Sequence, residues 1–137
     1  MQDTEIIRNA LKAMHFAHGN PALREIAEQM ENDEQSAVAL LQDSLKDGML
    51  TQDDLYYKYD MPKKVVKAVV LLTKTPEDTW QTYIRKVSRN NLARLVLATT
   101  IDYKLETGAL ENRREIRWAA DYLWALEPLD PDYGNDG

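Results

Sequence analysis

The chain has 137 residues, of which 44% are hydrophobic and 29% charged, with a net charge of −6. This length suits about one domain, and the composition excludes general disorder. The negative charge argues against general nucleic-acid binding, because neutralised phosphates supply most of that affinity. The chain contains no cysteine, which excludes disulfides and thiolate metal sites and favours a cytoplasmic location. No apolar stretch is long enough to span a membrane, so no membrane partner is expected.

Helical periodicity dominates the first third of the chain. Apolar residues at helical spacing predict a first helix over residues 3–18, ended by Gly19. Asparagine followed by proline at residues 20–21 predicts the start of a short second helix. A central helix is expected after the acidic stretch 31–34, with Gly48 as its C-terminal cap.

The next segments carry clear start signals. Thr51, followed by glutamine and two aspartates, is typical of an N-cap and predicts a brief helix over residues 55–59. Pro62 then opens a helix whose apolar face is rich in valine. Such a β-branched run also suits a strand, but the proline and the helical pattern favour a helix.

The last third predicts an amphipathic turn or two at residues 80–87, a long apolar segment at 92–105 and a final helix ending at Leu126. Residues 127–137 contain four acids, two prolines and two glycines and are expected to be a poorly ordered acidic tail. The sequence therefore predicts an all-α protein of about six to eight helices, with one domain over residues 1–126.

Four segments resemble one enzyme family. They are Ala39–Gly48, Val69–Lys74, Tyr83–Val87 and Asn90–Arg94. Together they resemble the HD-domain metal phosphohydrolases, in particular the branch that hydrolyses guanosine tetraphosphate-type alarmones. The similarity runs from about residue 10 to residue 126 and implies an HD-domain-like helical bundle.

The resemblance also implies where metal ligands would lie. The family's central helix reads Leu-Leu-His-Asp-x-x-Glu-Asp, and here its histidine position is Gln42, followed by Asp43. The family's earlier histidine has Glu25 as its nearest polar counterpart, and Thr100 stands at its late aspartate. Of the ligands only Asp43 remains, so we expect no bound metal, no other cofactor and no catalytic residue.

A second acidic pair of the family corresponds to Lys46 and Asp47. We expect Lys46 to form an ion pair with Asp43. An alternative is a phosphohydrolase with a rebuilt site, in which Glu25, Asp43 and Asp47 bind Mn²⁺ or Mg²⁺ through oxygen ligands. That alternative requires the three carboxylates to converge, with Asp43 and Asp47 as its catalytic residues.

Several polar residues lie in segments that border the nucleotide pocket of the family. They are Lys46, Asp47, Lys74, Arg85, Asn90 and Arg94. The resemblance predicts a ligand pocket there, whereas the usual place of such residues is an exposed helix face. The two histidines, His15 and His18, are expected to pack or to cap a helix.

The sequence as a whole predicts a catalytically inactive HD-domain-like protein that binds a nucleotide or a protein partner. A helical interaction protein with no ligand cleft is the third possibility. Oligomers could form through the final helix, where Trp118 and Trp124 widen the apolar surface.

Overall fold

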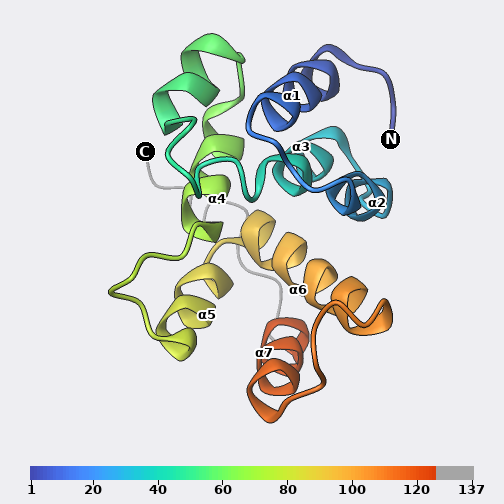
Figure 1. Cartoon of the computed structure of the whole chain (residues 1–137), viewed down its shortest axis with the longest axis vertical. Coiled ribbons are helices and arrows are strands. Elements are labelled where there is room, and N and C mark those ends of the chain that lie inside the picture. The colour runs from blue at the N-terminus through green and yellow to red at the C-terminus, as the bar shows by residue number, and fades with distance from the viewer. Residues whose placement is uncertain (126–137) are drawn as a thin grey trace. The chain divides into compact units, whose positions relative to one another are not determined.

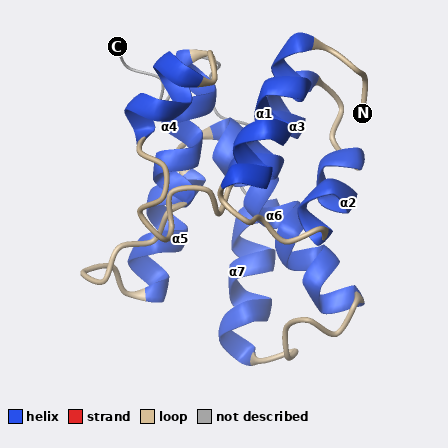
Figure 2. Cartoon of the chain, turned by 45° about the horizontal axis from the view of Figure 1, so that its top comes forward, coloured by secondary structure: helices blue, strands red, loops and turns tan. Residues whose placement is uncertain are grey.

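The computed structural model describes residues 1–125, which form eight helices and no strand (Figure 2). The prediction of an all-α protein with six to eight helices is confirmed. The predicted tail, residues 127–137, lies outside the described residues, as does Leu126. The chain divides into two compact units, Met1–Thr73 and Lys74–Gly137, and a single domain over residues 1–126 stays a prediction. No helix in the described part is both long and apolar enough to cross a membrane.

The first unit is built around one buried helix. Its elements are α1 (Glu5–Phe16), α2 (Ala22–Glu28), α3 (Asp33–Leu41), the π-helix η1 (Asp54–Lys58) and α4 (Lys63–Leu72). Residues 36–41 of α3 are all buried, because α1, α2 and α4 pack around this helix (Figure 1). A helix that is apolar on every side needs such neighbours to remove its surface from water.

The end of α1 uses a histidine where glycine was predicted. The helix ends at Phe16, and His18 takes the left-handed conformation with φ of 56°. The Gly19 N–H donates to the Met14 carbonyl at 2.9 Å and the His18 N–H to the His15 carbonyl at 3.1 Å, which is a Schellman motif. The His18 backbone thus forms part of the cap, which is one of the two roles expected for the histidines. Gly19 is needed for space, since a Cβ there would lie 2.5 Å from Met14 Cγ.

The central helix is shorter than predicted. We expected it to reach Gly48, but α3 ends at Leu41 and successive turns follow. The Ser44 hydroxyl donates to the Leu41 carbonyl at 2.7 Å, and the Ser44 N–H donates to the same carbonyl at 2.9 Å. These bonds replace the i to i+4 pattern of an α-helix, because serine side chains compete for backbone groups. Gly48 has φ of 75° and ends the turns.

The start signals of η1 and α4 are confirmed. Thr51 Oγ1 accepts from the Asp54 N–H at 3.2 Å, and Asp54 Oδ2 accepts from the Thr51 N–H at 2.9 Å, a reciprocal capping pair. The predicted brief helix is a π-helix, with the Tyr59 N–H donating to the Asp54 carbonyl at 3.0 Å. Pro62 immediately precedes α4, whose valine-rich face is buried.

The second unit contains three helices. They are α5 (Trp80–Ser88), α6 (Asn91–Glu106) and α7 (Arg114–Ala125). Each packs against the other two (Figure 1). The side chain of Thr79 caps α5 and that of Asn90 caps α6, which satisfies N–H groups that the helices themselves leave open. Ile84, Val87 and Leu123 are among the side chains that form the core of this unit.

Candidate functional site

The positions that the resemblance assigns to metal ligands lie in both units. Glu25, Gln42 and Asp43 belong to the first unit and Thr100 to the second. The buried Gln42 donates from Nε2 to the Ala39 carbonyl at 3.1 Å. The buried Thr100 donates from Oγ1 to the Val96 carbonyl at 2.7 Å. Both side chains are therefore bonded to the backbone of their own helix segments, as buried polar groups require.

The predicted carboxylates are not assembled into a metal site. Glu25 lies exposed on α2, while Asp43 and Asp47 lie exposed in the turns after α3. Within residues 1–125, no group of three or more His, Asp or Glu side chains is arranged to hold a metal ion. The convergence that a rebuilt carboxylate site requires is not found there.

The prediction of an ion pair between Lys46 and Asp43 is wrong. The Lys46 backbone N–H donates to the Asp43 carbonyl at 3.3 Å, but their side chains form no ion pair in the described part of the chain. Both side chains are exposed. Water solvates such charges well, so a surface ion pair would add little stability.

The predicted pocket residues of the second unit have different surroundings. Asn90 is 1% exposed, and its Oδ1 accepts from the Ala93 N–H at 2.9 Å, so it caps α6. Arg94 is half-buried and donates to Asn91 Oδ1 at 3.4 Å. Lys74 is exposed before α5. Arg85 lines a cleft in this unit.

This cleft lies on the side of the second unit where α5 and α7 pack together, and its volume is about 340 Å³. We call it the α5–α7 cleft. Its lining residues are Gln81, Arg85, Arg114, Glu115 and Trp118. Gln81 and Arg85 are one turn apart on α5, and the other three occupy the first turns of α7. Spacings of three and four residues bring side chains to one helix face.

A hydrogen bond next to the cleft joins the two helices. Trp80 Nε1 donates to the Glu115 carbonyl at 3.1 Å. The ring of Trp80 lies 5.9 Å from the ring of Tyr83, and the ring of Trp118 lies 5.3 Å from that of Tyr122. These contacts fix the Glu115 backbone and the Trp118 indole beside the cleft.

The charge of the cleft is positive. Arg85 and Arg114 carry two positive charges against one negative charge on Glu115. Neither guanidinium forms an ion pair with any residue in the range 1–125. The amino end of α7 adds partial positive charge through the helix dipole. Two guanidiniums beside an indole can bind an anion and stack a planar group.

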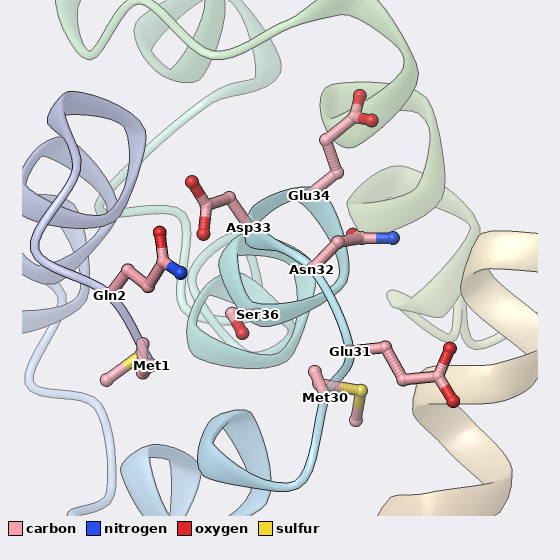
Figure 3. Close-up of a pocket in the computed structure, with 8 residues that line it drawn as sticks. All are labelled: Met1, Gln2, Met30, Glu31, Asn32, Asp33, Glu34 and Ser36. Atoms are coloured by element: carbon pink, nitrogen blue, oxygen red, sulfur yellow. The ribbon is translucent and has the colours of Figure 1, made fainter.

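A second hollow, of about 580 Å³, lies in the first unit at the start of α3 (Figure 3). Three acidic side chains line it, namely Glu31, Asp33 and Glu34. They point in different directions in Figure 3, and Glu34 forms an ion pair with Lys64 at 3.3 Å. The hollow therefore offers no converging set of ligands.

Comparison with known proteins adds no family assignment. No protein-family model matches the chain, and no curated protein sequence matches it either.

Sequence reasoning found Arg85 but missed most of the cleft. Gln81, Arg114, Glu115 and Trp118 were not predicted as site residues. Arg85 was predicted because its segment resembles one that borders the nucleotide pocket of the family. Nothing in the local pattern joins Arg85 to Arg114, because 28 residues separate them.

Proposed function

We propose that the chain is a catalytically inactive, HD-domain-like binding module that binds a nucleotide-type anion in the α5–α7 cleft. The observation that carries this proposal is the pair of guanidiniums, Arg85 and Arg114, without ion-pair partners in the described residues and beside Trp118. Guanidinium groups bind phosphate oxygens in bidentate geometry. An indole gives a nucleobase a surface for stacking, worth about 1–3 kcal/mol per base.

The size and the polarity of the cleft agree with a small ligand. Its volume of about 340 Å³ lies near the lower end of the range of roughly 300–1,000 Å³ for small-molecule sites. Gln81 adds an amide that can donate to and accept from a base edge. Glu115 can accept from ligand amino or hydroxyl groups and disfavours a phosphate on its own side of the cleft.

The inactive character is supported by the hydrogen bonds of Gln42 and Thr100. Hydrolysis in this family needs a metal-activated water, which in turn needs several ligands around one ion. Gln42 and Thr100 use their side chains to satisfy helix carbonyls, and the described carboxylates form no group for a metal. Binding without turnover follows as the proposed activity.

Calorimetric titration of the purified protein with guanosine tetraphosphate, ATP and inorganic pyrophosphate tests the proposal. We expect Arg85→Gln and Arg114→Gln each to weaken binding at least about tenfold, since each removes a charge-assisted hydrogen bond of about 1.5–3 kcal/mol. Arg117→Gln is the matched control, because Arg117 is exposed on α7 outside the cleft and its loss should change affinity less than about twofold.

Two results would contradict the proposal. If both arginine variants bind as the unchanged protein does, the ligand does not occupy this cleft. If the protein hydrolyses any of these nucleotides with Mn²⁺, and Asp43→Ala abolishes the activity, the chain is an enzyme and the inactive assignment is wrong.

A further inference from the structure

The charge and the aromatic ring that line the α5–α7 cleft are repeated one helix turn further along. In the cleft, α5 contributes Arg85 and α7 contributes Trp118. Four residues later each helix has the same kind of side chain again, with Arg89 at the C-cap of α5 and Tyr122 on α7. Side chains four residues apart share one helix face. We call Arg85 and Arg89 the arginine row, and Trp118 and Tyr122 the aromatic row.

The two rows run in the same direction. Trp80 Nε1, at the start of α5, donates to the Glu115 carbonyl in the first turn of α7 at 3.1 Å. Both helices therefore begin at the same end of the second unit, and they run the same way from there (Figure 1). Four residues of an α-helix rise about 6 Å. The second residue of each row is displaced from the first by about this distance, toward the same end of the unit.

Both rows have surface left for a ligand. The Arg89 side chain is exposed and forms no ion pair within residues 1–125. Trp118 and Tyr122 are half-buried, and their rings lie 5.3 Å apart at an angle of 35°. Part of each ring is open to solvent, which allows a planar group to stack on it.

The charge of this region differs in sign from that of the whole chain. The helices α5 and α7, together with Arg89, carry five basic residues and two acids, Glu115 and Asp121. The chain as a whole has a net charge of −6, which argues against nucleic-acid binding over a large surface. A small positive face still attracts a short anionic ligand, because local charge sets the potential close to the surface.

We infer that the α5–α7 cleft binds one nucleotide of a short single-stranded RNA and that Arg89 and Tyr122 bind the next one. The first of these two positions rests on the proposed function. A nucleic-acid strand repeats a phosphate and a base, and the two rows repeat a cation and an aromatic ring in the same order. Proteins that bind single strands combine these two kinds of contact. A mononucleotide has no second unit to occupy Arg89 and Tyr122.

The spacing of the rows and the acid in the cleft select the kind of strand. The step of about 6 Å exceeds the roughly 3.4 Å between stacked nucleotides of one strand, so the bound strand is extended and its bases are unstacked. Proteins recognise single-stranded RNA in that form. Glu115 in the cleft disfavours a phosphate but can accept from a ribose 2′-hydroxyl, a group that DNA lacks.

The test compares a four-nucleotide RNA, tetrauridylate, with uridine monophosphate by calorimetric titration of the full chain. We expect tetrauridylate to bind at least about tenfold more tightly, because it gains a second charge-assisted contact and a second stacked base. Arg89→Gln should weaken tetrauridylate binding about three- to tenfold and leave the affinity for uridine monophosphate and pyrophosphate within about twofold. The same RNA made as DNA, tetrathymidylate, should bind at least about threefold more weakly.

Salt dependence separates a phosphate contact from a general change of charge. Each neutralised phosphate of a single strand contributes about −0.7 to the slope of the logarithm of affinity against that of NaCl concentration. Arg89→Gln should make this slope less steep by about 0.7 for tetrauridylate. Arg117→Gln is the matched control, because it removes the same charge from α7 outside the cleft. It should change the slope by less than half as much.

A second variant tests the aromatic row. Tyr122→Leu keeps an apolar side chain beside Trp118 but removes the ring on which the second base stacks. It should weaken tetrauridylate binding at least about fivefold and weaken the binding of uridine monophosphate less.

The outcomes separate this inference from the proposed function. If uridine monophosphate binds but tetrauridylate binds no more tightly, or if Arg89→Gln acts no more strongly than Arg117→Gln, the second position is overturned and the proposed function stands. Equal binding of tetrathymidylate overturns the assignment to RNA. If tetrauridylate binds and Arg89→Gln weakens it, while no nucleotide or pyrophosphate binds, the proposed function is overturned and the RNA site stands.

Discussion

The two units differ in the surroundings of the polar side chains that were predicted to form a site. In the first unit, the residues that a metal site would have used are bonded to nearby carbonyls, as at Gln42, or exposed to solvent, as at Asp43. In the second unit, Arg85 and Arg114 line one cleft and have no ion pair among the described residues. The cleft of the proposed binding function therefore belongs to the second unit, whereas Gln42 and Asp43 of the family pattern belong to the first.

The largest expected effect comes from truncating one core side chain in each unit. Leu41 and Ile84 are both fully buried, and Leu41→Ala and Ile84→Ala should each lower the free energy of unfolding by about 2–5 kcal/mol. All three tryptophans lie in the second unit, so their fluorescence reports unfolding there, while circular dichroism at 222 nm reports helix loss in both units.

The free energy of unfolding is measured by urea unfolding, followed by tryptophan fluorescence and by circular dichroism. Ile84→Ala should shift the fluorescence transition, and Leu41→Ala should shift the dichroism transition. Val70→Ala is the control, since Val70 is 38% exposed and should cost less than about 1 kcal/mol. If Leu41→Ala also lowers the free energy of unfolding by less than about 1 kcal/mol, α3 is not the helix around which the first unit packs.

A medium effect should distinguish the helix caps of the two units. Asn90 caps α6 and is 1% exposed, whereas Asn32 caps α3 at the surface. Removing a cap costs about 0.5–2 kcal/mol, and the cost is largest where the open N–H cannot reach water. We expect Asn90→Ala to destabilise the protein by about 2 kcal/mol and Asn32→Ala by about half as much, measured by thermal unfolding.

The change Asn90→Ser keeps a neutral oxygen acceptor of the kind preferred at an N-cap and should restore part of the stability. If Asn90→Ala costs no more than Asn32→Ala, capping is not the reason for the burial of Asn90.

The smallest effect concerns Asp78, ahead of α5. A hydrogen bond from Lys86 Nζ at 3.0 Å, with further bonds from Thr75, holds the pKa of the Asp78 carboxyl below its ordinary value of 3.8. A lowered pKa means that the folded state favours the carboxylate. The stabilisation is fully present above about pH 3.8 and is lost as the pH falls through the lowered value.

Asp78→Asn should therefore be slightly less stable than the unchanged chain at pH 7, and the two should converge at the acidic end of the range. Thermal unfolding between pH 7 and pH 2 measures the difference, and Glu77→Gln is the neighbouring control on an exposed acid. A difference that stays constant down to pH 2 would show that the ion pair is not its source.

Local signals in the sequence predicted the helix starts well. Thr51, Pro62 and the Asn20-Pro21 pair act through their own backbone geometry and through groups two or three residues away. The end of α3 was predicted six residues too late, because the Ser44 hydroxyl and the turn that follows compete with the helix for the Leu41 carbonyl.

The sequence by itself determined that this protein is helical, where most helices begin and which faces are apolar, since these follow from spacing and from neighbouring residues. Only the tertiary structure decided which polar groups are already bonded and which line a cleft. Arg85, Arg114 and Trp118 line one cleft because α5 packs against α7. That packing depends on contacts between residues far apart in the chain.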